Sequence, residues 1–234
     1  MIRLERLAVN YGGVRALDGL TIELEPGRVY GLIGPNGAGK STAVNVITGV
    51  TRAASGRIFI GGRDVTHAPA HARARAGMAR TFQNLALFSS LTVRENVASG
   101  ALHHGKGLAA VDEALKAFNL AEYQNSLTPS LPLGIRKRVE LARALISDPR
   151  LLLLDEPAAG LTPEDMSDLT SRVRKLQKIG GTVLIVEHNM PLVMSLCEYV
   201  FVLEFGQLIA QGTPKEVKEN ARVQSAYFGS EHEV

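Results

Sequence analysis

The chain has one cysteine, no tryptophan and no long run of apolar residues. The single thiol, Cys197, excludes an internal disulfide and is typical of a protein kept in a reducing compartment. No stretch of about 18 consecutive apolar residues is present, so the sequence predicts no membrane-spanning helix. Residues 1–5, MIRLE, show no apolar segment of a secretory signal. We therefore expect a cytosolic chain, for which a peripheral place on a membrane protein remains open.

The net charge of +3 is small, and aromatic residues make up only 5% of the 234 residues. Such a charge does not by itself predict a nucleic-acid partner, and we expect none. The length suffices for one large α/β domain with room for an inserted lobe. Composition thus indicates an ordinary globular chain, and its chemistry has to be found in its motifs.

The segment from Gly34 to Ser41, GPNGAGKS, fits the pattern G-x-x-x-x-G-K-[ST] of a phosphate-binding loop. Residues 28–33 before it are typical of a short buried strand, and residues 41–48 of a helix. Glycines let backbone N–H groups approach phosphate oxygens, and the positive end of the helix points at the same group. In such a loop Lys40 reaches the β- and γ-phosphates, and the Ser41 hydroxyl is a Mg²⁺ ligand. The loop predicts binding of a nucleoside triphosphate.

Two acidic residues, Asp155 and Glu156, directly follow the apolar run from Leu151 to Leu154. Ligands of open α/β sheets bind at the carboxyl ends of the strands, where these side chains emerge. Asp155 is placed to hold Mg²⁺ through water, and Glu156 is the better candidate for the general base on an attacking water. The alternative is that Asp155 and Glu156 are simply two solvated acids at the end of a strand. The phosphate-binding loop in the same chain argues against this alternative.

Two polar residues follow other predicted strands. His188 comes after the buried run of residues 182–186, where an imidazole can bond the γ-phosphate and orient a water. Gln83 follows Arg80-Thr81-Phe82, where an amide can sense the metal or the water. Each is a common structural residue by itself and gains weight only beside the loop and the two carboxylates.

Short apolar strands alternate with helices, which predicts a mostly parallel sheet covered on both faces. Alternating segments near the N-terminus and at residues 58–60 predict an antiparallel β region beside it. Between them, Thr92 opens a helix with a capping box, and residues 111–118 carry one apolar helical face. We expect an α/β P-loop NTPase core of the RecA-like type from residues 1–84 and 149–234, with an antiparallel β subdomain. Residues 85–148 form an inserted helical subdomain in this interpretation.

These motifs, in this order, resemble the ATP-binding subunit of ABC transporters over nearly the whole chain. The resemblance identifies Gly34–Ser41 with Thr42 as the Walker A motif and Asp155 and Glu156 as Walker B with its catalytic carboxylate. It implies an ATPase that uses ATP and Mg²⁺. By resemblance, Gln83 is the Q-loop residue, His188 the switch histidine, residues 159–162 the D-loop, and Tyr11 the aromatic residue that stacks on adenine. The expected nucleotide contacts are Tyr11, Asn36, Gly37, Gly39, Lys40, Ser41 and Thr42, the expected metal residues Ser41, Gln83 and Asp155, and the expected catalytic residues Lys40, Gln83, Glu156 and His188.

Three segments narrow the resemblance to uptake systems for branched-chain (hydrophobic) amino acids. They are residues 77–88, with GMARTFQN and Leu87-Phe88, residues 187–190, EHNM, and residues 224–229, QSAYFG. Urea and short-amide importers share these features, so the same ATPase role for those substrates is the alternative. A P-loop kinase could use the helical lobe as a lid, and a non-transport ABC protein usually carries a coiled-coil insertion or a second ATPase unit, neither of which is present. A GTPase is excluded because no N-K-x-D motif occurs.

Residues 131–135, LPLGI, depart from the signature L-S-G-G-Q of the family. Pro132 replaces the serine whose hydroxyl contacts the γ-phosphate held by the partner subunit, and Ile135 replaces the glutamine. Gly134 remains and is the one residue here that we expect to contact that nucleotide in trans. A proline in the first turn of a helix does not disturb folding, so the expected loss is in hydrogen-bond donors.

The family pairs two ATPase subunits head to tail, and these drive transmembrane permease subunits that a substrate-binding protein serves indirectly. Complete Walker motifs beside a weak signature favour a heterodimer with a second ABC ATPase subunit, and a homodimer is the alternative. The resemblance implies a peripheral position at the cytoplasmic face of the cell (inner) membrane.

Overall fold

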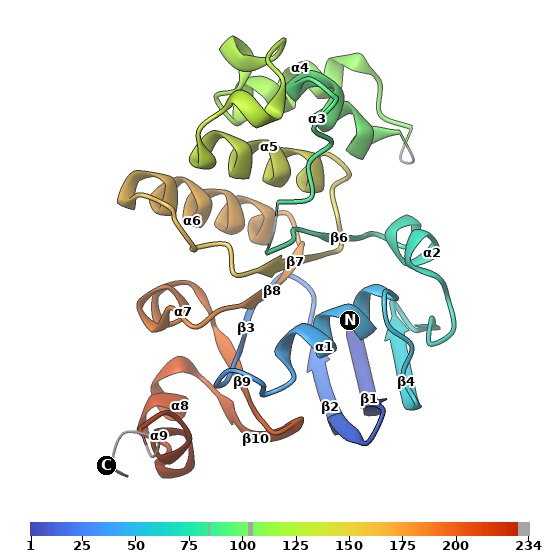
Figure 1. Ribbon diagram of the computed structural model, residues 1–234, viewed down its shortest axis with the longest axis vertical. Helices are drawn as coiled ribbons and strands as arrows, with labels where there is room; N and C mark the ends of the chain where they lie inside the picture. Colours follow the sequence, from blue (N-terminus) through green and yellow to red (C-terminus); the bar gives the residue numbers. More distant parts are fainter. Residues whose placement is uncertain (84, 103–104, 229–234) are drawn as a thin grey trace.

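The computed structural model describes residues 1–83, 85–102 and 105–228 (Figure 1). Asn84 and Gly229, which carry part of the subfamily resemblance, lie outside the described residues. No helix in these three segments is both long enough and apolar enough to cross a membrane.

The larger sheet has six strands in the order β10-β9-β3-β8-β7-β6. Its pairs are parallel except β9 with β10, which form an antiparallel hairpin. This arrangement confirms the predicted mostly parallel sheet. The strands are β3 (Val29–Ile33), β6 (Met78–Arg80), β7 (Leu151–Asp155), β8 (Thr182–Val186), β9 (Tyr199–Glu204) and β10 (Gln207–Gly212).

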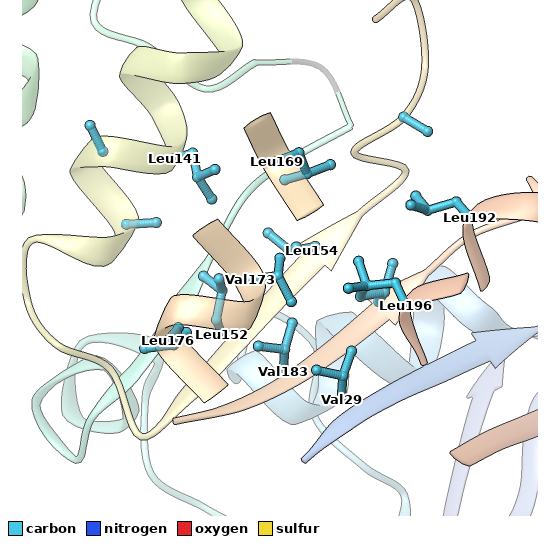
Figure 2. Close-up of a cluster of buried hydrophobic side chains, with 14 of the residues drawn as sticks. Val29, Leu141, Leu152, Leu154, Leu169, Val173, Leu176, Val183, Leu192 and Leu196 are labelled. Carbon is cyan, nitrogen blue, oxygen red and sulfur yellow. The ribbon is translucent and has the colours of Figure 1, made fainter. Parts of the chain in front are cut away.

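Both faces of this sheet are covered, which explains why its strands read as continuous apolar runs. In β7, Leu152 and Leu154 join one buried cluster, and Leu151 and Leu153 join another on the opposite face. Figure 2 shows the first cluster, where Leu152 and Leu154 lie beside Val173. Since side chains alternate across a strand, one run of four leucines stabilises two cores.

A second, antiparallel sheet has the order β2-β1-β4-β5. Its side chains share a buried cluster with α1 (Lys40–Thr48) and with the near face of the larger sheet. It confirms the predicted antiparallel region, including the hairpin between β4 and β5 at Gly61-Gly62. The strands are β1 (Ile2–Tyr11), β2 (Val14–Leu24), β4 (Ser55–Ile60) and β5 (Arg63–Asp64).

The helices of residues 85–148 gather at one end of the long axis of the molecule, above the sheets in Figure 1. Thr92 caps the first of them with the predicted capping box, and Val111, Leu115 and Phe118 are buried as expected. The limits of this subdomain at residues 85 and 148 stay a prediction. Its elements are α3 (Val93–Ala101), α4 (Leu108–Ala117), η1 (Ala121–Tyr123), η2 (Thr128–Ser130) and α5 (Leu133–Leu145).

Five further helices complete the described chain, and α6 and α7 cover the cluster shown in Figure 2. Cys197 ends α7 and is buried, and this burial raises the pKa of its thiol to about 12. The thiol therefore stays protonated and acts as a small apolar group. The helices are α2 (Ala70–Arg75), α6 (Pro163–Lys178), α7 (Met190–Leu196), α8 (Pro214–Glu219) and α9 (Ala221–Phe228).

The packing around β7 predicts a large loss of stability on truncation of Leu152, which is fully buried. Leu152→Ala is expected to lower the free energy of unfolding by about 2–5 kcal/mol, because it removes buried methyl groups and leaves a cavity. Ile179→Ala is the matched control, since that side chain is 72% exposed, and its effect should stay within about 0.5 kcal/mol. Urea unfolding measures both, and equal midpoints would contradict the assigned core.

Candidate nucleotide-binding and hydrolysis site

Four neighbouring strands of the larger sheet, β3, β8, β7 and β6, run parallel and end at one edge. The phosphate-binding loop follows β3, Glu187-His188 follows β8, Asp155 closes β7 with Glu156 after it, and Gln83 lies just beyond β6. Residues that are far apart in the sequence therefore meet at the edge where ligands of such sheets bind.

The conformation of the loop requires its glycines. Gly34 has a φ of +152°, and a Cβ there would lie 2.2 Å from the carbonyl oxygen of Leu203. Gly39 has a φ of +99°, and a Cβ there would lie 2.5 Å from the carbonyl oxygen of Ala16. Any side chain at either position would have to displace backbone, so these glycines close the loop against the adjoining strands.

The start of α1 is free to face an anion. Gly39 precedes the helix, and no side chain in the described part of the chain caps its first turn. The first N–H groups of an α-helix have no partner within the helix, and those of α1 lie beside the exposed Ser41 and the half-buried Thr42. Asn36 and Gly37 are exposed on the loop itself. The end of the helix thus offers backbone donors and a positive partial charge to a phosphate.

Lys40 is folded back onto the loop. Its Nζ donates to the carbonyl oxygens of Gly34, at 2.6 Å, and of Pro35, at 2.9 Å. Burial lowers the pKa of this ammonium group, and the carboxylates of Glu156 and Asp155 act in the opposite direction. Among the described residues, the direct partners of this buried cation are the two neutral carbonyl oxygens, and phosphate oxygens would be stronger acceptors for it.

Asp155 is buried, and its carboxylate is held by a residue that the sequence analysis missed. Arg80 Nη2 lies 2.9 Å from Asp155 Oδ2. Arg80 closes β6, the strand next to β7. The available signal was the charge of an arginine directly before the Q-loop segment, but the pairing of β6 with β7 could not be read from the sequence.

Glu156 meets both of the other predicted catalytic groups. Gln83 Nε2 donates to its Oε2 at 2.8 Å, and His188 Nδ1 lies 3.8 Å from its Oε1. Glu156 also has a φ of +47°, a conformation that is strained for a residue with a side chain and costs about 1–3 kcal/mol. Its N–H donates to the carbonyl oxygen of Val186, 2.9 Å away, which anchors the turn. The structure brings Gln83, Glu156 and His188 together.

Glu187 is a second residue that the sequence analysis missed as a functional element. It is 1% exposed, and its carboxylate accepts from the backbone N–H groups of Ala158, His188 and Asn189 at 2.8–3.1 Å. One buried carboxylate thus holds the turn after Walker B and the turn that carries the histidine. Its place directly before His188 was the only sequence signal.

Residues 131–135, which depart from the signature of the family, lead into α5 and begin it. Pro132 is the residue before α5, with extended φ and ψ, so it lies just outside the first turn in which we expected it. Ile135 is 7% exposed and packs in the core rather than facing outward. A Cβ on Gly134 would lie 2.4 Å from Asp165 Oδ2, and one on Gly160 would lie 2.8 Å from Leu133 Cδ2. At Gly134 the nearest atoms are the end of a flexible side chain, which can turn aside, so packing alone does not require glycine there.

Tyr11 lies at the end of β1, half exposed. Its hydroxyl is 3.3 Å from Thr51 Oγ1, beyond the C-terminal end of α1, whereas the phosphate-binding loop precedes the other end of that helix. Stacking of Tyr11 on adenine stays a prediction.

Two models of known protein families match parts of this chain. The family model described as ABC transporter matches residues 17–159, and a model described as branched-chain amino acid ATP-binding cassette transporter matches residues 207–233. The chain belongs to the ATP-binding subunits of ABC transporters, which are ATPases coupled to transport.

Among similar relatives are the high-affinity branched-chain amino acid transport ATP-binding proteins BraF of Pseudomonas aeruginosa and LivG of Escherichia coli K12. Each is 34% identical to this chain, over 98% of both sequences. The lipopolysaccharide export system ATP-binding protein LptB of Haemophilus influenzae is also 34% identical, over 100% of this chain and 99% of its own.

Solved structures confirm the predicted fold class. A nucleotide-free ATP-binding cassette from an ABC transporter is 31% identical and matches with a TM-score of 0.89, over 98% of this chain and 99% of the other. The ADP conformation of an ATP-binding cassette is 32% identical, with a TM-score of 0.88 over 98% of each chain.

The position of Pro132 directly before α5 predicts that Pro132→Ser stabilises the protein. The serine hydroxyl can accept from a first-turn N–H of α5, for which no side chain of the described residues is a cap. The cap contributes about 0.5–2 kcal/mol, and loss of the proline offsets about 0.4–1 kcal/mol of it, so the free energy of unfolding should rise by about 1 kcal/mol or less. We also expect higher ATPase activity of the isolated chain, because the serine restores a donor. Ile135→Gln would bury an amide in an apolar cluster, so the double variant should be less stable than Pro132→Ser alone. A destabilised single variant would contradict the assigned cap.

Proposed function

We propose that this chain is the ATP-hydrolysing subunit of an importer for branched-chain or other hydrophobic amino acids. The match of residues 207–233 to the branched-chain family model supports this substrate class, as do BraF and LivG. LptB, at the same identity, makes lipopolysaccharide export the second candidate. Import of urea or short amides follows as a further alternative within the same ATPase role.

The contact of Gln83 and His188 with the two oxygens of Glu156 carries the proposed mechanism. Glu156 is the general base that takes the proton of the attacking water, and Gln83 orients its carboxylate. His188 is 66% exposed at its side chain, so it can turn from Glu156 toward the γ-phosphate. Lys40 would exchange its two loop carbonyls for the β- and γ-phosphates.

Magnesium fits the donor set at this edge. No group of three or more His, Cys, Asp or Glu side chains in the described segments could hold a metal by itself. A serine hydroxyl, an amide and one carboxylate are present instead, which suits an ion that keeps several waters and takes its remaining ligands from phosphates. Ser41, Gln83 and Asp155 would hold it, and when bound it would neutralise charge on the phosphates.

The second half of each site is expected from another subunit. Gly134 and its neighbours would face the Walker A motif of the partner, as the resemblance implies. Pro132 provides no hydroxyl there, so this chain would serve the site of its partner poorly, while its own loop, Asp155 and Glu156 are complete. We therefore favour a heterodimer with a second ABC ATPase subunit.

A groove between the sheets and the helical region suits a permease subunit. It has a volume of about 620 Å³, and its walls come from α1, α2, the segment after β6, α3 and α5. Phe88 is 52% exposed and Phe82 is 39% exposed on its wall, which leaves aromatic surface for a partner. Docking here would place the chain at the cytoplasmic face of the membrane, with any substrate-binding protein acting indirectly through the permease.

The asymmetric dimer predicts unequal effects of one substitution. Glu156→Gln removes the base from the complete site and should lower ATPase turnover of the mixed dimer by about 100-fold or more. The same change in the partner should cost far less, because that site faces Pro132. Turnover of the two single-variant dimers measures this, with ATP binding as the control for folding. Equal losses would contradict the asymmetric model.

The substrate class predicts which ligand stimulates the intact complex. The tagged chain should co-purify with integral membrane subunits, and ATPase activity in proteoliposomes should rise several-fold with leucine and its binding protein. Urea and lipopolysaccharide should leave the rate unchanged. Stimulation by lipopolysaccharide would establish export instead, and purification without membrane subunits would favour a non-transport role.

A further inference from the structure

Arg80 contacts both the carboxylate of Asp155 and the aromatic wall of the groove. We propose that Arg80 is a positioning residue that orients Asp155 for the magnesium-bound nucleotide and links this carboxylate to the occupant of the groove. The inference rests on the proposed function, because it takes Asp155 as a residue of the metal site.

The contact with Asp155 is buried on both sides. Arg80 Nη2 lies 2.9 Å from Asp155 Oδ2, and the two side chains are 10% and 5% exposed. This hydrogen bond uses one of the two carboxylate oxygens. A buried ion pair of this kind is sensitive to geometry, since a misplaced partner leaves a charge without compensation. Arg80 therefore sets the direction in which the remaining oxygen points.

The other arm of the guanidinium reaches the helix that follows the phosphate-binding loop. Arg80 Nη1 donates to Asn45 Oδ1 at 2.7 Å and lies 3.4 Å from Thr48 Oγ1, both in α1. One planar group thus joins the loop helix and the end of β7. Lysine cannot reproduce this, because its single ammonium group has no rigid fork.

The face of the same guanidinium covers Phe82. Arg80 Cζ lies 4.6 Å from the centre of the Phe82 ring, a cation–π distance. Phe82 and Arg80 both line the groove. The backbone of Phe82 is fixed from α5, where Glu140 Oε1 accepts from its N–H at 3.1 Å. A partner that moves the Phe82 ring must therefore change the environment of the group that holds Asp155.

The test is the magnesium dependence of nucleotide binding. A fluorescent ATP analogue is titrated at increasing Mg²⁺, and Arg80→Lys and Arg80→Gln should each raise the half-saturating Mg²⁺ concentration about tenfold, as loss of an outer-shell partner does. Binding in EDTA should be unchanged. Arg63→Lys, an exposed arginine on the edge strand β5, is the matched control and should behave as wild type.

Phe82→Leu keeps the ion pair of Arg80 with Asp155 and removes only the aromatic ring. It therefore tests the link between Asp155 and the groove even if an Arg80 variant folds poorly. It should shift the Mg²⁺ dependence in the same direction by a smaller factor. Combined with Arg80→Lys it should add nothing further, and additive shifts would overturn the link. The positioning role would be overturned if both Arg80 variants had the half-saturating Mg²⁺ concentration of the wild type. A lower half-saturating Mg²⁺ concentration in Arg80→Gln would also overturn it. Failure of the wild-type chain to bind the analogue would instead refute the proposed function.

Discussion

Four parallel strands, β3, β8, β7 and β6, end at one edge of the sheet, and their backbone hydrogen bonds fix the register in which their last residues meet. Asp155 pairs with Val186, and the N–H of Glu156 continues that ladder. The sheet therefore fixes the backbone from which the Glu156 carboxylate extends. The backbone N–H and C=O of Glu156 are both hydrogen-bonded, and its side chain meets Gln83 and His188 from the turn that follows β7.

Three cations lie close to the acidic residues of the site, and one of them, Arg80, forms a direct ion pair with Asp155. Lys40, Arg80 and Lys137 lie among Asp155, Glu156 and Glu187, and burial lowers the pKa of both lysines. Lys137 donates to the carbonyl oxygens of Pro157, at 3.0 Å, and of Ala159, which attaches the signature helix to the D-loop. Lys40 and Lys137 donate to backbone carbonyl oxygens and Arg80 to Asp155 and α1, whereas Arg80 Nε is buried with no hydrogen-bond partner among the described residues. A phosphate bound by Lys40 would have to replace contacts that already exist.

The sequence predicted the parts of this site that depend on local pattern. The glycines of the loop and the leucines of β7 each follow from a periodicity or a motif, and the strands end where those patterns end. Arg80 and Glu187 could not be assigned from pattern because their roles depend on partners distant in sequence. Arg80 and Asp155 are 75 residues apart and meet only because β6 is the neighbour of β7.

The retained glycine of the signature, Gly134, lies against the start of α6 in the same chain. Asp165, in the first turn of α6, occupies the space that a Cβ on Gly134 would need, and Leu133 covers Gly160 of the D-loop in the same way. Because the Asp165 carboxylate is the end of a flexible side chain that can turn aside, packing within this chain only partly restricts position 134. Pro132 lies outside α5 and is exposed, so no such packing acts on it. Loss of the serine donor there is compatible with an intact fold, which is why the structure permits an asymmetric pair of sites.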